Sequence, residues 1–281
     1  MTPGPDHALD VLGFTGILER VARHASSDPG AEHIRGLRPS TAPGAVGASL
    51  DAVEQMRGFV GASPGWAPPP IPDVASDLDR LGVEGAVLDG SELRRLAALL
   101  GSSRRLRSDL MAEEDGRPAL TSRARELVRE PDLEKRLERS VDEGGRVVDA
   151  ASERLRRVRG ELRDARNGLV DRLEAFVRDL PDRHRLPDAS VTVRNGRYCV
   201  PIRRDARSAV GGIVHDESSS GQTLFVEPPP AIDPMNRIRE LEGDESREVQ
   251  RVLRELTGEV RPLEGELRLS LTRLVELDSL F

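Results

Sequence analysis

The sequence predicts a mainly α-helical protein, in which a helical core is followed by two long antiparallel helices that carry a small antiparallel β element. Three observations support this. A proline-free stretch over 151–180 has apolar residues every three or four positions, a β-like segment follows over 188–230, and a helical stretch of similar length covers 233–261. The β segment is too short to build a large core of its own. We therefore expect it at the far end of a helical pair.

Four parts are expected along the chain. They are a helical core domain over 1–130, outbound helices over 131–187, a β element over 188–232 and a returning helix over 233–281. In the first part, Asp89 has the residue type of a helix N-cap, and the proline-rich run over 63–73 cannot be helix or central strand. A helix over 43–60 is expected to carry an apolar stripe, namely Val46, Leu50, Val53, Met56 and Val60.

The most regular pattern lies in the stretch over 151–180. Its apolar residues follow one another in the order Leu155, Val158, Leu162, Ala165, Leu169, Leu173, Phe176 and Leu180. This spacing predicts one helix with a coiled-coil-like seam of about four heptads, ended by Pro181 and Pro187. In the returning helix, Gly258 and Pro262 are expected to kink or divide the chain.

Between the two long helices the pattern changes to that of β-strands. Two short alternating runs flank Asn195-Gly196, the residue pair that most strongly favours a two-residue hairpin turn. A second pair of strands is expected near 212–215 and 223–226, joined by a serine-rich loop. Cys199 lies on the second strand of the first hairpin, where we interpret it as a packing residue.

Composition excludes several classes of function. The chain holds 41 arginines and one lysine, Lys135, which has no glycine beside it, so a G-x-x-x-x-G-K-[ST] phosphate loop is absent from the sequence. A single cysteine excludes an intramolecular disulfide and a cysteine-rich zinc site, and the five histidines lack metal-ligand spacing. Neither a membrane span nor a signal peptide is evident. We expect a cytoplasmic protein with no metal or cofactor bound by this chain.

The charge is unevenly distributed. The net charge is −7, and residues 1–119 carry 12 basic and 17 acidic groups, whereas residues 190–210 carry five arginines and one acid, Asp205. These arginines are Arg194, Arg197, Arg203, Arg204 and Arg207. Because guanidinium groups bind phosphates in a bidentate manner, the cluster is a candidate nucleic-acid-binding surface. The alternative is a solvated hairpin end in a protein from an arginine-biased proteome.

The loop of the second hairpin has residue types that also occur in catalytic sites. In order, they are His215, Asp216, Ser218, Ser219 and Ser220. Neighbours on one short loop rarely point at a common centre, and no nucleophile elbow surrounds them, so we expect no catalytic residue here. A metal-dependent nuclease built on Asp216, Glu217 and Glu227 is a weaker alternative, because three acids without a positioning framework are common by chance. We interpret the loop as a hydrogen-bonding turn.

Two motifs resemble those of a known family. The segments SVTVRNGRYCVPI (190–202) and GIVHDESSSGQTLFVEP (212–228) are similar, in order and separation, to paired motifs of the MutS family of ATPases, specifically its bacterial MutS-two branch. The opening LDVLGFTGILERVARHASSDPG and the stretch VDEGGRVVDAASERLRRVR also resemble this branch. The resemblance therefore covers essentially the whole chain.

The resemblance implies a helical core, long lever helices and a β clamp at the lever tips. It implies a clamp that engages duplex or branched DNA, or ribosomes and their rRNA, and a homodimer formed through the full-length protein. In the family the ATPase follows the returning lever and a small Smr nuclease domain comes later, so ATP and Mg²⁺ are expected there, and this chain alone is expected not to be an enzyme. The nucleic-acid-binding residues expected on the clamp are Arg194, Asn195, Arg197, Arg203, Arg204, Arg207, His215, Ser218, Ser219 and Ser220.

One departure from the family pattern bears on this expectation. Glu217 stands where the branch usually has an uncharged glutamine, and an added acid in the loop weakens the affinity expected for phosphate. The rival function is a coiled-coil interaction or assembly module whose β element contacts another protein and binds no nucleic acid. Binding that weakens as salt rises would distinguish the two, because contacts to phosphates release counterions.

Overall fold

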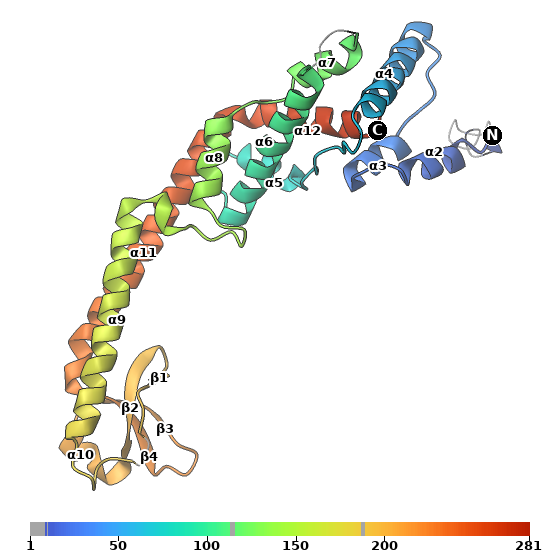
Figure 1. The fold of residues 1–281 in the computed structure, drawn as a ribbon. Coiled ribbons are helices and arrows are strands. Elements are labelled where there is room, and N and C mark those ends of the chain that lie inside the picture. The colour runs from blue at the N-terminus through green and yellow to red at the C-terminus, as the bar shows by residue number, and fades with distance from the viewer. Residues whose placement is uncertain (1–8, 10, 113–115, 187–188) are drawn as a thin grey trace. The chain divides into compact units, whose positions relative to one another are not determined.

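The computed structural model describes residues 9, 11–112, 116–186 and 189–281. The described chain is mainly helical with one small antiparallel four-stranded sheet, which confirms the predicted class (Figure 1). Its contacts divide it into two compact units, Met1–Val148 with Leu253–Phe281, and Asp149–Val252. Within the described ranges, no helix combines the length and the apolar character needed to cross a membrane. Pro187 and the expected boundary between 187 and 188 lie outside the described residues.

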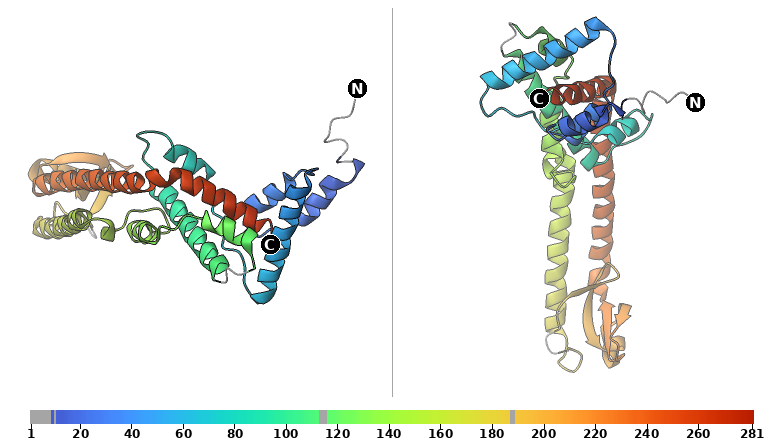
Figure 2. Two further views of the ribbon diagram at one scale, coloured as in Figure 1. Left: turned by 90° about the horizontal axis from the view of Figure 1, so that it is seen from above. Right: turned by 90° about the vertical axis from the view of Figure 1, so that its right-hand side faces the viewer.

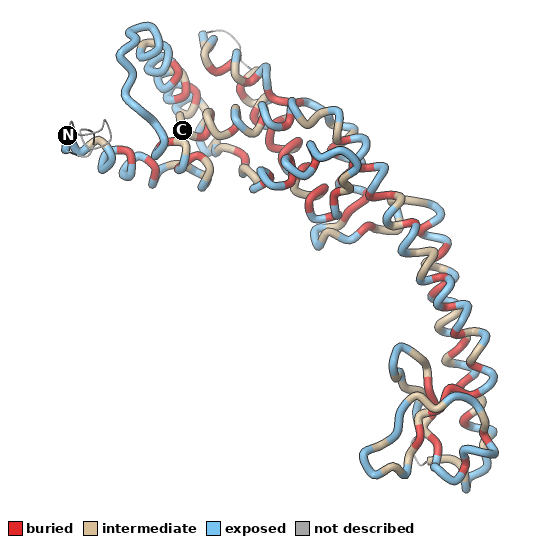
Figure 3. The backbone as a smooth tube through the Cα atoms, turned by 180° about the vertical axis from the view of Figure 1, so that it is seen from behind, coloured by how far each residue is buried: buried red, intermediate tan, exposed pale blue. Residues whose placement is uncertain are grey.

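The first unit is built from helices. They are α2 (Phe14–Ala22), α3 (Asp28–Arg35), α4 (Pro43–Ala62), α5 (Ala75–Leu81), α6 (Gly90–Met111), α7 (Pro118–Arg125), α8 (Pro131–Ser140), the end of α11 (Pro229–Val260), the 3-10 turn η3 (Arg261–Leu263) and α12 (Glu264–Asp278). The helix α6 is central, since α7, α8 and α12 all pack against it. Figure 3 shows buried positions recurring along these helices, as amphipathic packing requires.

The start of α6 follows directly from its sequence. Asp89 is the N-cap and accepts a hydrogen bond from the Glu92 amide (2.9 Å), while the Glu92 carboxylate accepts one from the Asp89 amide (2.6 Å). This reciprocal capping box satisfies amides that the first helical turn leaves free, and it confirms the predicted cap. Trp66, in the predicted surface connection, donates its indole hydrogen to Asp109 (2.9 Å) and packs edge-on against Phe59.

The apolar stripe predicted on the helix over 43–60 only partly forms the core. The structure buries Ala52, Met56 and Phe59 on α4, which packs against α7. Three members of the predicted stripe are exposed instead, namely Val46 (39%), Leu50 (65%) and Val53 (47%). Two neighbouring rows of apolar residues run along this helix at the same spacing, and periodicity alone does not say which of them meets a partner.

The helices of the second unit form an antiparallel pair (Figure 2). After the 3-10 turn η1 (Asp149–Ala151), α9 runs over Glu153–Asp179. Its buried residues are Leu155, Val158, Leu162, Leu169, Leu173 and Val177. Ion pairs join Arg159 to Glu245 and Arg166 to Glu242, each at 2.7 Å. The later residue of α9 thus pairs with the earlier residue of α11, as expected for two antiparallel helices. The predicted helix over 151–180 is therefore confirmed, with Ser152 as its N-cap.

The returning helix α11 begins earlier than predicted, at Pro229 rather than after residue 232. The first turn of a helix tolerates proline, because amides there have no partner within the helix. Pro234 lies further inside α11. At the other end, η3 with Pro262 divides α11 from α12, as predicted, whereas Gly258 lies within continuous helix.

The sheet has the strand order β1-β2-β4-β3, with every pair antiparallel. The strands are β1 (Thr192–Arg194), β2 (Arg197–Arg203), β3 (Ile213–Glu217) and β4 (Thr223–Glu227), with η2 (Arg204–Ala206) and α10 (Arg207–Val210) between β2 and β3. Asn195 (φ 50°) and Gly196 (φ 71°) form the two-residue turn, the left-handed backbone that this pair favours. The first part of β2 pairs with β1 and its second part with β4, so this strand joins the two predicted hairpins.

Candidate nucleic-acid interface

One cluster of the predicted binding residues lies where β2 ends. Arg203 closes the strand, Arg204 opens η2, and both line a shallow cavity of about 480 Å³ together with Asp205, Ser220 and Gly221. Pairing of the end of β2 with the start of β4 brings the second hairpin's loop beside them. Arg204 and Gly221, which lie 17 positions apart in the sequence, thus share one surface.

Arg204 is held by groups of this loop. One of its terminal nitrogens donates to the Gly221 carbonyl (2.8 Å) and lies 3.1 Å from the Glu217 carboxylate. Both side chains of this ion pair are more than half exposed, so water screens their attraction. Glu217 therefore forms an ion pair with Arg204 but leaves the Arg204 guanidinium exposed to solvent.

Arg203 and Arg207 are the least restrained of the five arginines. Both are exposed, Arg203 at the end of β2 and Arg207 at the start of α10. Within the described ranges, neither has a carboxylate within ion-pairing distance. Their guanidinium groups are available to an anion from solution.

The serine-rich loop is ordered mainly by its first serine. The hydroxyl of Ser218 accepts a hydrogen bond from the Thr223 amide (3.1 Å), and its carbonyl accepts one from the Gly221 amide (2.7 Å). Gly221 adopts a positive φ of 69°, which glycine allows at no steric cost. Ser219 and Ser220 are exposed on this frame. The prediction of a hydrogen-bonding turn is confirmed.

Two further predicted residues lie at the turn of the first hairpin. The Arg194 guanidinium lies 4.3 Å from the centre of the Phe225 ring, and its Nε lies 3.2 Å from the Asp216 carboxylate. The Asn195 side chain donates to the His215 carbonyl (3.0 Å). These contacts fasten the hairpin turn onto β3 and β4.

Arg197 and His215 point into the unit, at a buried acid. The side chain of Glu227 is 1% exposed, and its two oxygens lie 3.1 Å from Arg197 and 2.7 Å from His215 Nε2. Nearby, burial first and then the Glu227 charge raise the pKa of the Cys199 thiol to about 11, so this thiol stays protonated at neutral pH. The contacts of Arg197 and His215 hold β2, β3 and β4 together.

The predicted residues therefore form two groups. Arg203, Arg204 and Arg207 lie at and just after the end of β2, and Ser218, Ser219 and Ser220 lie in the loop of the second hairpin. Arg194, Asn195, Arg197 and His215 are instead engaged around Asp216 and Glu227. Over residues 189–232 five arginines face four acids, so the strong local excess of positive charge in 190–210 is nearly cancelled by the second hairpin. The candidate surface is narrower than the sequence suggested.

Sequence reasoning missed two basic residues beside this surface. The segment after α9 pairs with the end of β2 through an isolated bridge between Arg185 and Ile202, and the Arg203 amide donates to the His184 carbonyl (3.4 Å). Arg183 and Arg185 are thereby brought to the same end of the unit. The sequence does contain a basic run, PDRHR (181–185), that could have predicted them, but it lies just before residues 190–210, over which the charge was counted.

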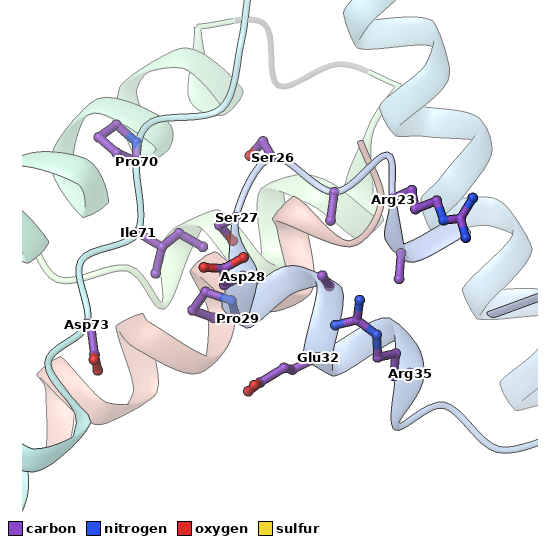
Figure 4. A pocket seen from close by; sticks show the side chains of 13 residues that line it. Arg23, Ser26, Ser27, Asp28, Pro29, Glu32, Arg35, Pro70, Ile71 and Asp73 are labelled. Atoms are coloured by element: carbon purple, nitrogen blue, oxygen red, sulfur yellow. The ribbon is translucent and has the colours of Figure 1, made fainter. Parts of the chain in front are cut away.

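A pocket of about 740 Å³ in the first unit lies beside the contact between α3 and α12 (Figure 4). The hydroxyls of Ser26 and Ser27 donate to the buried Asp278 carboxylate, the second at 2.6 Å, and so hold the start of α3 on α12. A Cβ at Gly30 would lie 1.9 Å from Asp278, so the two helices touch closely here. Across the part of the chain that the structure describes, no three His, Cys, Asp or Glu side chains are grouped as metal ligands.

Comparison with known proteins agrees with the motifs on the sheet. No protein-family model matches the chain. The chain is 44% identical to the MutS2 endonuclease of Gemmatimonas aurantiaca over 98% of its own length and 34% of that protein. It is MutS2-like. MutS2 endonucleases of Geobacillus thermodenitrificans and Pelotomaculum thermopropionicum are 38% and 34% identical to it, over 97% and 96% of the chain. The chain spans about a third of the length of these curated MutS2 relatives.

Proposed function

We propose that the second unit is a nucleic-acid-binding lever and clamp. In this proposal α9 and α11 are the lever helices, and the four-stranded sheet is the clamp that contacts a phosphate backbone. The observation that carries the proposal is the exposure of two arginines near the end of β2 that form no ion pair within the described ranges, Arg203 beside the loop of the second hairpin and Arg207 at the start of α10. Guanidinium groups free of carboxylates can form bidentate bonds to phosphates at little desolvation cost.

The ten residues predicted for the site take two roles in this proposal. Arg203, Arg204, Arg207, Ser219 and Ser220 contact phosphates. The remaining residues shape the surface through their contacts with Asp216, Glu227 and the loop backbone, and they are Arg194, Asn195, Arg197, His215 and Ser218. Phosphate contacts position a protein on nucleic acid without reading its sequence, so we expect binding of little sequence preference.

The MutS2 relatives suggest what the clamp engages. We infer that its target in the cytoplasm is duplex or branched DNA, or the rRNA of a ribosome, because all of them present closely spaced phosphates. The relatives carry the name endonuclease. We assign such activity, ATP with Mg²⁺, and dimer formation to the full-length protein. In this proposal the predicted ranges are 1–130 for the core, 131–187 for the outbound lever, 188–232 for the clamp and 233–281 for the returning lever. The lever helices proper are α9 and α11, because α8 and α12 pack within the first unit.

The proposal is tested by the salt dependence of binding. The double variant Arg203→Gln/Arg207→Gln removes two phosphate contacts, so the slope of log K against log salt for a duplex should fall in magnitude by about 2. The matched control, Arg156→Gln/Arg157→Gln, removes the same charge from exposed positions on α9 and should leave the slope unchanged. Branched DNA and rRNA are titrated in parallel to identify the preferred target.

Two outcomes would contradict the proposal. Equal slopes for the two double variants would mean that binding follows net charge and not this surface. If neither DNA nor rRNA shows salt-sensitive binding, the coiled-coil protein-interaction function is supported instead. A third variant, Glu217→Gln, releases Arg204 from its ion pair (3.1 Å) and should steepen the slope by up to about 1.

A further inference from the structure

A second basic site lies in the first unit, on one face of α6. Arg104, Arg107, Ser108 and Met111 line a cavity of about 380 Å³ together with Arg129, which follows α7. Residues at positions i, i+3, i+4 and i+7 share one face of a helix, so the four residues of α6 converge by the geometry of the helix itself. The volume lies within the range of small-molecule sites.

Arg104 is fixed in place by a buried acid. Its Nε and Nη2 donate to the two oxygens of Glu134, at 2.7 and 2.9 Å, and the Glu134 side chain is only 7% exposed. The hydrogen bond to Glu134 raises the pKa of Arg104 above its ordinary value, so the group stays charged. A guanidinium has five N–H donors, so three remain for another partner.

Arg107 is fixed by the backbone. Its Nη1 donates to the carbonyl oxygens of Arg125 (2.9 Å) and Leu127 (2.6 Å), which leaves its Nε and Nη2 hydrogens for another partner. Two of the three guanidiniums are therefore held before any ligand arrives. Holding a donor in advance lowers the entropy cost of binding.

The charge of the site favours an anion. The described residues that line the cavity are three arginines, a serine and a methionine, and the Glu134 carboxylate behind Arg104 balances only one of the three positive charges. Residues 1–119 as a whole carry more acids than bases, whereas the described lining of this cavity is basic. Forked guanidinium donors fit the oxygens of a phosphate.

We propose that this cavity binds a phosphate group, carried either by a free mononucleotide or by a nucleic-acid strand. Arg104 and Arg107 present fixed donors, Arg129 supplies a third guanidinium, and Ser108 adds a hydroxyl. The site shares no residue with the candidate surface on the sheet. It therefore goes beyond the proposed clamp function, and its failure would leave that proposal untouched.

The test uses the full chain and a single neutralised arginine. Arg129→Gln removes an exposed guanidinium, and Arg105→Gln removes the same charge from an exposed position of α6 outside the cavity. Pyrophosphate, adenosine monophosphate and a short DNA duplex are titrated by calorimetry at constant ionic strength. We expect Arg129→Gln to weaken binding at least tenfold, Ser108→Ala to weaken it severalfold, and Arg105→Gln to leave it unchanged.

Each outcome decides the proposal. Binding of adenosine monophosphate that Arg129→Gln weakens identifies a free phosphate ester as the ligand, and binding of the duplex alone that Arg129→Gln weakens identifies a strand. The proposal is overturned if none of the three probes binds, if Arg129→Gln leaves binding unchanged, or if Arg105→Gln weakens binding as much as Arg129→Gln. The Nε–Hε signals of Arg104 and Arg107, observed by NMR in the unmodified chain, should shift on adding the bound probe, which makes the result independent of any folding defect.

Discussion

The buried carboxylate of Glu227 should stabilise the sheet strongly, and the change Glu227→Gln tests this. The glutamine keeps the volume of the side chain but removes the charge that faces Arg197 and His215. The structure predicts that β2, β3 and β4 then separate more readily. The tertiary structure of the first unit should be unaffected by this substitution.

The size of the effect follows from the exposure of the three groups. Removing one partner of a fully buried ion pair costs about 3–5 kcal/mol. Here Arg197 and His215 retain 21% and 18% exposure, so water solvates part of what Glu227 leaves behind, and the amide oxygen still accepts one hydrogen bond. We therefore expect about 2 kcal/mol, between the cost of an unsatisfied polar group and that of a buried charge.

Hydrogen exchange measures this effect locally. The amides of β2 and β4 should exchange about 30-fold faster, since about 1.4 kcal/mol corresponds to a factor of ten. Amides of α6 serve as an internal reference. The matched variant Glu217→Gln breaks an ion pair whose carboxylate is 58% exposed and should cost at most about 0.5 kcal/mol. Similar exchange rates of the β2 and β4 amides in the two variants would contradict the stabilising role of the buried Glu227 carboxylate.

Two further predictions concern the helices. Hydrogen bonds from Arg251 and Ser152 lower the pKa of Glu248 to about 2, so its contribution to the free energy of unfolding is complete above about pH 5 and lost as the pH falls towards 2. Glu248→Gln should flatten this dependence in urea titrations between pH 6 and 3, and an unchanged profile would contradict it. A Cβ at Gly90 would lie 2.0 Å from the Gly145 carbonyl oxygen, so Gly90→Ala should cost roughly 1–3 kcal/mol in thermal unfolding. A Cβ at Gly58 on α4 would meet no atom within 4 Å, so the control Gly58→Ala should be neutral or stabilising. An equal loss of stability in the Gly90 and Gly58 variants would contradict a steric clash at Gly90.

Features set by local chemistry could be predicted from the sequence. Asn195-Gly196 specifies its turn because both residues tolerate a positive φ, and Asp89 specifies its cap because its carboxylate reaches the amides of the next turn. The helix predicted over 151–180 is found over Glu153–Asp179, since a regular apolar seam free of proline leaves few alternatives.

Features that depend on a distant partner could not be predicted. Val46, Leu50 and Val53 have the spacing of a core face, yet α7 packs on the neighbouring row. Arg197 and Glu227 lie 30 positions apart, and only the pairing of β2 with β4 makes the arginine a structural partner rather than a surface group. Counts of charge along the chain cannot detect such neutralisation.

The most direct test of the proposed clamp is a hydrogen-exchange footprint of the full chain with and without a saturating DNA duplex. We expect slower exchange in the two segments that meet at the end of β2, residues 203–207 and 218–222, with no change along the middle of α9. Protection that is confined to α9, or absent throughout the sheet while the duplex is bound, would contradict it.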